Sequence, residues 1–323
     1  MRYHPGTIDF REMVLPVLAV LLLFMASIYL PFVGVFFGIW TPLPLVYAYL
    51  ERGPAQAAAV LGAAALFILT LSGGAFTALF ALEYGVMAAV MGELIRQGNP
   101  REKVAFYGAV APALCSFAAI FVFFSGTETD FFSFMKEKID FAIRETIESY
   151  QAKGMNQEQI QVLETHSSQM INLFVRLVPA WFIAGSLMTA AANYAAIKKI
   201  WIKRFAGESP YFRDIPFSQW VLSDYFIWAL IAAGLALLLP LGPLNDAGIN
   251  LLFLSLLVYT ISGMAVLLYW LEKNKNYHFF VLIMTVLLLI QPIFLLIIAG
   301  LGIFDIWVDF RKLRAQPPPL KSN

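Results

Sequence analysis

Long apolar segments, separated by short stretches that hold most of the charged residues, run through nearly the whole chain. About 20 helical residues cross the ~30 Å hydrocarbon core of a bilayer, and each segment is long enough for such a crossing. Because lipid cannot hydrogen-bond an open backbone, we expect these segments to be helices. They are Met13–Leu30, Phe32–Leu50, Ala55–Leu71, Ala75–Ile95, Val104–Phe124, Met170–Ile197, Trp220–Leu239, Ile249–Leu271 and Phe279–Leu301.

The pattern predicts an all-α fold, a polytopic integral membrane helical bundle in which residues 13–314 form one membrane domain. The chain is 60% hydrophobic and only 13% charged, against roughly 25% charged residues in soluble domains. Met13–Leu50 fits two spans or one span with a re-entrant piece, and Pro292 interrupts the last segment. We therefore expect eight or nine transmembrane segments. The first is expected to be retained because no signal-peptide cleavage site follows it.

Basic residues predict which loops face the cytoplasm. Arg96, Arg101 and Lys103 mark one such loop, and the basic group within 198–213 marks another. The segment between them, 126–169, has eight acidic and four basic residues and is predicted to lie outside. The basic residues of 311–314 break this alternation if one crossing follows Lys275. We expect "FDIWVDFRKL" to lie at the membrane interface and 315–323 to be a disordered tail.

The polar insert 126–169 has its own helical pattern. Asn156 and Gln159 resemble a capping box that opens a second helix after Gly154. The insert either rests on the outer surface as a helical hairpin or forms a lid over an outward-facing cavity. Apolar residues recur at helical spacing in its first half, and these are Phe131, Met135, Ile139, Ile143, Ile147 and Tyr150.

Glu83 lies near the middle of the apolar segment Ala75–Ile95. A charged group at mid-span costs about 3 kcal/mol on insertion scales, so it should face protein or water, or have a partner. Arg176 is the only basic residue well inside a predicted span, at a similar predicted depth. We predict an intramembrane Glu83–Arg176 ion pair. It would be a static packing contact or a substrate or proton site, and the remaining alternative is that the two groups do not touch.

Further polar residues within the spans are candidates for lining a cavity, although such groups also hydrogen-bond between helices simply to hold them together. They are Tyr84, Thr189, Asn193, Tyr259, Ser262 and Gln291. Small residues four apart permit close helix packing or the docking of a membrane protein partner. These sets are Ala55, Ala59 and Ala63; Ala81, Gly85 and Ala89; and Ala184, Ala192 and Ala196, the last interrupted by Met188.

Several classes of protein are not indicated. The net charge of +1 gives no reason to expect a nucleic-acid partner. Three scattered histidines and the single Cys115 predict no metal site, and we expect no cofactor. Hydrolase, protease and nucleotide-binding signatures are missing, so we do not expect an enzyme.

Three stretches together resemble the YybS-like family of bacterial inner-membrane proteins, a domain of unknown function. They are "LFVRLVPAWFIAGSLMTAAANYAAIKK", "RDIPFSQWVLSDYFIW" and "GLGIFDIWVDFRKL". The resemblance implies a location in the bacterial inner membrane. It also implies a distant kinship with the substrate-binding S components of energy-coupling-factor transporters, which dock on a membrane partner through alanine-rich faces.

Two functions remain from the sequence. The first is a solute-binding or transport subunit that takes a small molecule through a cavity beneath the insert. The alternative is a membrane scaffold or assembly factor of an envelope complex, with an enzyme acting on lipid as the third choice. For each function we expect the lipid bilayer to surround the chain as a partner.

Overall fold

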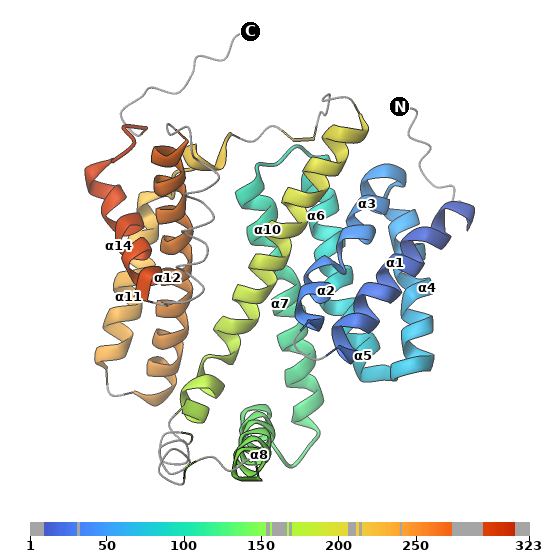
Figure 1. Ribbon diagram of the computed structural model, residues 1–323, viewed down its shortest axis with the longest axis horizontal. Coiled ribbons are helices and arrows are strands. Elements are labelled where there is room, and N and C mark those ends of the chain that lie inside the picture. Colours follow the sequence, from blue (N-terminus) through green and yellow to red (C-terminus); the bar gives the residue numbers. More distant parts are fainter. Residues whose placement is uncertain are drawn as a thin grey trace. The chain divides into compact units, whose positions relative to one another are not determined.

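The computed structural model describes residues 10–30, 33–152, 156, 167, 170–205, 211–212, 215–239, 241–272 and 293–313. Its residues group into two compact units. The first contains residues 1–175 and 181–214, and the second contains 176–180 and 215–323. The described residues form helices joined by turns (Figure 1).

The first unit contains a bundle of helices. Within it α3 packs against α4 and α6, α1 against α2 and α4, and α6 against α7. Its core includes Phe24 and Phe80, whose ring centroids lie 5.1 Å apart. The elements are α1 (Phe10–Tyr29), α2 (Gly34–Trp40), α3 (Leu43–Arg52), α4 (Pro54–Ser72), α5 (Gly74–Leu79), the π-helical turn η1 (Phe80–Gly85), α6 (Val86–Arg96), α7 (Arg101–Ser125), α8 (Phe131–Ala152) and most of α10 (Val178–Arg204).

The second unit is built around α12. Both α11 and α14 pack against it, as does the short turn η2. The elements are the 3-10 turns η2 (Phe217–Gln219) and η3 (Asp224–Phe226), and the helices α11 (Ile227–Leu238), α12 (Gly242–Leu271) and α14 (Ile293–Val308).

Six helices in the described part of the chain are long and apolar enough to cross a membrane. This agrees with a helical membrane bundle but does not confirm eight or nine segments. The segment predicted at Phe279–Leu301 lies partly outside the described residues, and the predicted tail 315–323 lies wholly outside them. The six are Phe10–Tyr29, Pro54–Ser72, Gly74–Arg96, Arg101–Ser125, Val178–Arg204 and Gly242–Leu271.

The predicted segment Phe32–Leu50 is two short helices, α2 and α3, rather than one. Thr41 and Pro42 between them keep right-handed helical dihedrals. The break follows from Pro42 and Pro44, which have no N–H to donate to the preceding turn. Two short helices that are separated at Thr41 and Pro42 therefore follow α1.

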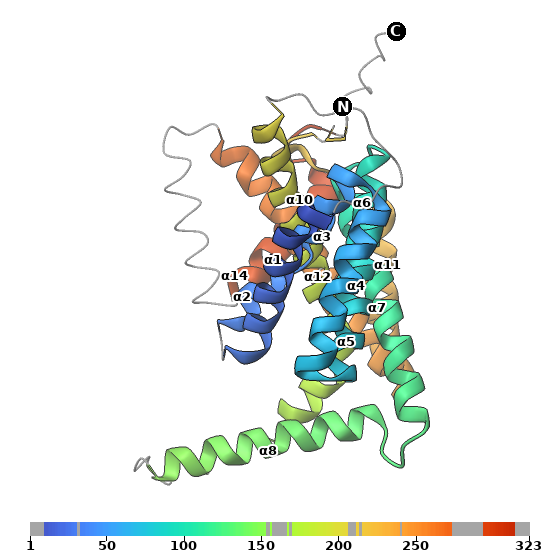
Figure 2. The ribbon, with the colours of Figure 1, turned by 90° about the vertical axis from the view of Figure 1, so that its right-hand side faces the viewer.

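The first predicted helix of the insert is present as α8. It spans Phe131–Ala152 and lies across the end of α7 (Figure 2). Five of the six predicted apolar positions are buried or half-buried, and Tyr150 is exposed at 39%. The second predicted helix and Gly154 lie outside the described residues, apart from Asn156 and Ser167.

The segment predicted as the span Trp220–Leu239 is helical only from Asp224. The backbone before Asp224 is not α-helical, and Arg311 supplies partners for its carbonyl groups. Arg311 Nη1 donates to the carbonyl oxygens of Ser218 and Trp220, both at 2.8 Å. Its Nη2 lies 2.7 Å from Asp305 Oδ2, and both side chains of this ion pair are buried. The pair buries the charge of Arg311 inside the second unit, and whether the C-terminal basic stretch lies at the membrane interface remains a prediction.

Helices α12 and α14 approach each other very closely at two glycines. A Cβ added to Gly302 would collide with the carbonyl oxygen of Tyr259, and one added to Gly263 would collide with that of Ile298. Thr260 also contacts the Leu295 carbonyl oxygen, at 3.4 Å. Small residues at such a crossing let helix backbones meet, which is the main source of packing energy in lipid.

We expect Gly302→Ala to destabilise the protein by about 1–3 kcal/mol or more, because a backbone atom cannot move aside as a flexible side chain can. Gly300→Ala is the matched control, since a Cβ there meets nothing within 4 Å. The measurement is the melting temperature of the purified protein in detergent. Equal melting temperatures for the two variants would contradict the close crossing.

Asp130 is expected to anchor the first turn of α8. Its carboxylate accepts hydrogen bonds from the Ser133 hydroxyl at 2.5 Å and from the backbone N–H groups of Phe132 and Ser133. The Ser133 hydroxyl and these amides hold the pKa of Asp130 below its ordinary value of 3.8. Because the folded-state pKa is lowered, this capping is complete above the ordinary value and is lost as the pH falls through the lowered one.

Asp130→Ala should therefore reduce the hydrogen-exchange protection of the Phe132 and Ser133 amides at neutral pH. In the unchanged protein the same protection should weaken only in acid. Substitution of its exposed neighbour, Glu128→Ala, serves as the control. Unchanged protection in Asp130→Ala would show that the cap does not hold this turn.

Candidate functional site

Glu83 lies in the π-helical turn η1, which interrupts the helical segment from Gly74 to Arg96. A π-helical turn adds a residue to the helix and so changes the direction of the side chains that follow. The turn is packed against α4, α5, α6 and α7. Such turns are rare and occur frequently at functional sites.

The Glu83 carboxylate is held by two hydroxyl groups from other helices. Ser186 of α10 donates to Oε1 at 2.5 Å, and Ser116 of α7 lies 3.4 Å from Oε2. Glu83 is 9% exposed, and both serines are 3% exposed. We call these three residues the Glu83 cluster. It joins η1, α7 and α10 through side chains that are buried inside the first unit.

Glu83 and Arg176, the predicted ion pair, lie in different units, and the pair stays a prediction. Each group has other partners: Glu83 has the two serines, and Arg176 binds Asp246. The local helix geometry explains why Arg176 can bind Asp246. The helical stretch 170–176 ends in a turn at Leu177, immediately before α10 begins. Arg176 thus lies at a helix junction with its side chain 39% exposed, rather than inside a continuous span.

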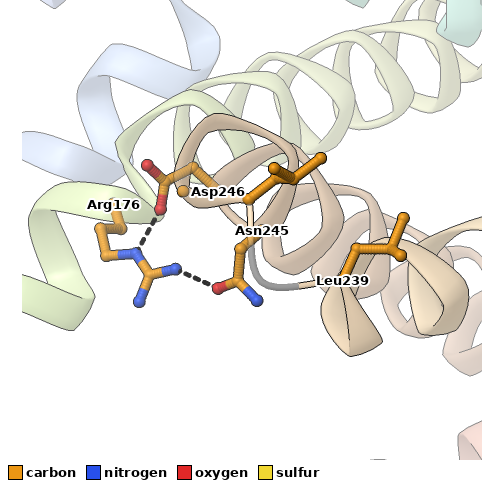
Figure 3. Close-up of a pocket in the computed structure, with 6 residues that line it drawn as sticks. Arg176, Leu239, Asn245 and Asp246 are labelled. Carbon is orange, nitrogen blue, oxygen red and sulfur yellow. Dashed lines mark hydrogen bonds and ion pairs between the residues drawn. The ribbon is translucent and has the colours of Figure 1, made fainter.

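Arg176 instead lies in a shallow polar cup of the second unit (Figure 3). Its Nε donates to Asp246 Oδ1 at 2.5 Å and its Nη2 to Asn245 Oδ1 at 2.6 Å. Leu239, Leu241 and Gly242 complete the lining of this cup, whose volume is about 360 Å³. The charges of Arg176 and Asp246 cancel, and the Asp246 side chain is 53% exposed.

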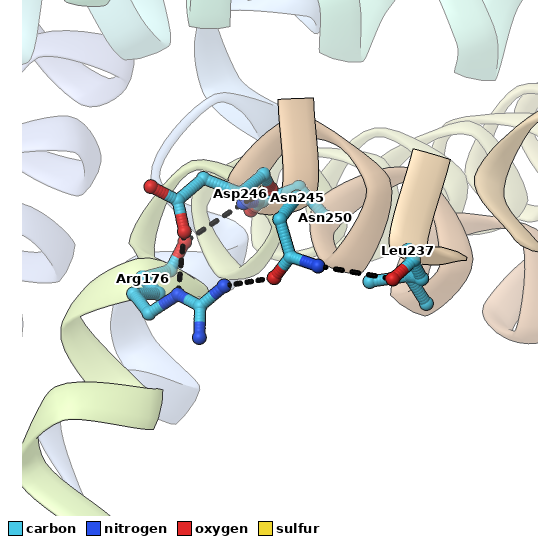
Figure 4. Close-up of polar contacts among 5 residues, drawn as sticks. All are labelled: Arg176, Leu237, Asn245, Asp246 and Asn250. Atoms are coloured by element: carbon cyan, nitrogen blue, oxygen red, sulfur yellow. Dashed lines mark hydrogen bonds and ion pairs between the residues drawn. The ribbon is translucent and has the colours of Figure 1, made fainter. Parts of the chain in front are cut away.

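Asn250 binds the backbone at the junction before α10 (Figure 4). Its Nδ2 donates to the Arg176 carbonyl oxygen at 2.8 Å, and its Oδ1 accepts from the Ala180 N–H at 2.9 Å. Asn245 in turn donates to the Leu237 carbonyl oxygen at 3.2 Å. Backbone groups that the helix break leaves without helical partners are therefore satisfied by side chains of α12.

The sequence analysis did not single out Asn245, Asp246 or Asn250, of which the first two lie between the predicted spans Trp220–Leu239 and Ile249–Leu271. The structure begins α12 at Gly242, with Pro243 in its first turn. The available signal was Asp246, an acid close to the start of the predicted span Ile249–Leu271. Proline at the start of a helix was a second signal.

The structure divides the predicted cavity residues between the two units. Tyr84, Thr189 and Asn193 belong to the first, whereas Tyr259 and Ser262 belong to the second. Gln291 lies outside the described residues. Tyr84 packs edge-on against the Phe24 ring, and Tyr259 is fully buried beside Phe226. These contacts are those of packed helices, and whether the residues line a cavity remains a prediction.

One face of α10 carries three polar residues, Ser186, Thr189 and Asn193, all at most 8% exposed. Their spacing of three and seven residues places them on one side of the helix. Asn193 Nδ2 donates to the carbonyl oxygens of Ile39 and Thr189, at 2.6 and 2.7 Å. The amide orientation is therefore set by two acceptors, and among the described residues its buried Oδ1 has no hydrogen-bond partner.

The small-residue faces differ in burial. Gly85 is buried, and a Cβ there would collide with Leu61, so it serves packing within the first unit. Ala184 is buried, whereas Ala55 and Ala89 are exposed. A partner-docking role for the exposed positions remains a prediction.

Within the described residues, no group of three or more His, Cys, Asp and Glu side chains is placed to hold a metal ion. Cys115 is exposed. The buried polar groups of this part of the chain are carboxyl, hydroxyl, amide and the guanidinium of Arg311.

These features define a class: a multi-pass helical membrane protein with polar groups buried between its helices. The family model "Predicted membrane protein (DUF2232)" matches residues 17–306, so the chain belongs to this family. The resemblance to the YybS-like family is thereby confirmed, whereas the similarity to the transporter S components is not shown. No curated protein and no solved structure matches the chain.

We predict that Asn250→Ala destabilises the protein by about 1–3 kcal/mol, because it leaves buried backbone groups at the junction without partners. Asp246→Ala removes a partly exposed ion pair and should cost only about 0–1 kcal/mol. Urea titration of the purified protein in detergent gives both values. A larger loss for Asp246→Ala than for Asn250→Ala would reverse this ranking.

Proposed function

We propose that this protein is a solute-binding or transport subunit of the bacterial inner membrane, with the Glu83 cluster as its binding centre. The observation that supports it is a buried carboxyl group in a π-helical turn, which within the described part of the chain is hydrogen-bonded to the hydroxyls of Ser116 and Ser186. Ionisable residues inside membrane spans are rare and typically mark substrate or ion pathways.

Simple packing gives a weaker account of Glu83. A glutamine there would offer the same hydrogen-bonding shape to two serines without the cost of taking a charge out of water. Among the described residues, no basic side chain forms an ion pair with Glu83 to offset that cost. A carboxyl group at this place is therefore more useful for binding than for holding helices together.

The α10 face next to the cluster supports the same proposal. Asn193 presents a buried acceptor oxygen on the same side of the helix as Ser186. Polar groups with unused hydrogen-bonding capacity are what a solute would meet inside an otherwise apolar bundle. The proposal assigns no catalytic chemistry to the chain.

The alternative function is a scaffold or assembly factor of an envelope complex. The exposed side of α8 and the exposed Ala55 and Ala89 are compatible with it. In that case Glu83 would have no ligand, and its replacement would leave interactions with partners unchanged.

A thermal-shift screen of the purified full-length protein against small metabolites tests the proposal, because a ligand that binds the folded state raises its melting temperature. We expect at least one compound to raise it by an amount that Glu83→Gln abolishes and Glu93→Gln preserves. Glu93 is the matched control on the same helical segment, bonded to Tyr49 and Gln97. A ligand shift that survives Glu83→Gln would move the binding centre elsewhere.

A further inference from the structure

We propose that the Glu83 carboxyl is a proton-carrying group, which takes up and releases H⁺ as the protein works. This inference rests on the proposed function, since it names the ion that would accompany the solute. The proton-carrying site comprises Glu83, its two serine partners, and the polar face of α10 that continues to Asn193.

The chemistry of the cluster suits a proton better than a metal ion. Ca²⁺ and Mg²⁺ require about six or more oxygen ligands in proteins. Among the described residues three side chains meet here, and the contact from Ser186 Oγ to Glu83 Oε1 is 2.5 Å. A carboxyl group that exchanges H⁺ needs only a hydrogen-bond partner that can stay in place in both protonation states, and a hydroxyl does so because it can donate or accept.

The elements packed against η1 offer no fixed charge near the carboxyl. Helices α4 and α5 carry no charged residue. On α6 the charged groups are Glu93 and Arg96, which by their sequence separation lie about 15 Å and about 20 Å along the helix from Glu83.

The other three neighbouring helices carry their charges near their ends. On α1, whose Phe24 packs against Phe80 and Tyr84 of η1, the charged groups are Arg11 and Glu12, and Tyr29 is its other ionisable group. Those of α7 are Arg101, Glu102 and Lys103, and those of α10 are Lys198, Lys199, Lys203 and Arg204. The other ionisable groups on η1, α7 and α10 are Tyr84, Tyr107, Cys115 and Tyr194. Of the charged groups named, none is placed to fix Glu83 permanently as an anion, so its charge is free to change.

The polar face of α10 supplies a direction for the proton. Asn193 lies seven residues beyond Ser186, or about 10 Å at 1.5 Å per residue. Its unpartnered Oδ1 is a buried acceptor on that face. The position of Asn193 indicates that H⁺ is exchanged through the end of α10 that carries the lysines.

The step is a plain proton transfer. The Glu83 carboxylate gains one H⁺ from water and becomes a neutral carboxylic acid, and it later returns that H⁺ to water. No bond other than O–H forms or breaks, and no electron is transferred.

Infrared difference spectroscopy on the full-length protein in lipid nanodiscs tests this proposal. A protonated carboxylic acid has its own C=O stretching band, which disappears when the acid ionises. Between about pH 5 and about pH 9, we expect a band of this kind that is lost in Glu83→Gln and kept in Glu93→Gln. In Ser186→Ala, which retains the acid, the band should disappear at a higher pH because the carboxylate has lost a hydroxyl donor.

Three results would overturn the proposal. The first is a band that persists unchanged in Glu83→Gln, and the second is that no carboxylic acid titrates in the unchanged protein. The third is that Na⁺ added at constant pH removes the band, which would assign the cluster to Na⁺. Asn193→Leu should slow the rate at which the band responds to a pH jump, and an unchanged rate would contradict the α10 route.

The same variants separate this inference from the proposed function. A solute whose melting shift depends on Glu83, in a protein without the titrating band, would overturn proton carriage and leave solute binding standing. A Glu83-dependent band in a protein that no solute stabilises would support proton carriage and count against solute binding.

Discussion

The hydrogen bonds between Glu83 and the two serines depend on one constraint: hydrocarbon offers no partner to a polar group. A carboxyl among apolar helices must find its donors on neighbouring helices, and Ser116 and Ser186 supply them. The same contacts therefore fix the positions of η1, α7 and α10 relative to each other. Glu83 holds these helices together and, in our proposal, changes its charge. Its protonation state is therefore linked to the packing of the first unit.

The second unit follows the same constraint with different residues. Asn250 satisfies backbone groups at the break before α10, and the buried Arg311–Asp305 pair satisfies the carbonyl groups of Ser218 and Trp220. In both places a polar side chain permits a non-helical backbone that lipid would not tolerate. Breaking a buried pair is costly because the remaining charge has no partner. These contacts are structural, whereas no described residue gives the Glu83 cluster an opposite charge, and it is the stronger candidate for binding.

Transport and scaffolding differ in what they require of Glu83. A transporter uses a group whose interactions change during its cycle, and a carboxyl held by neutral hydroxyls meets that requirement. A scaffold requires exposed surfaces that recognise a partner, for which the exposed alanines of α4 and α6 and the exposed side of α8 are available. The family match establishes a membrane protein and does not distinguish the two.

Hydrophobic length and spacing by themselves determined the membrane class, the main spans and the amphipathic α8, because these depend on residues close together in the chain. They also singled out Glu83, since a lone acid in an apolar run is costly wherever it lies. Only the tertiary structure decided its partners: serine is common in apolar helices, and nothing local marks Ser116 or Ser186 as facing Glu83. The same holds for Arg176, paired with Asp246, and for Arg311, buried against Asp305, because a partner distant in sequence is chosen by how helices pack and where they break.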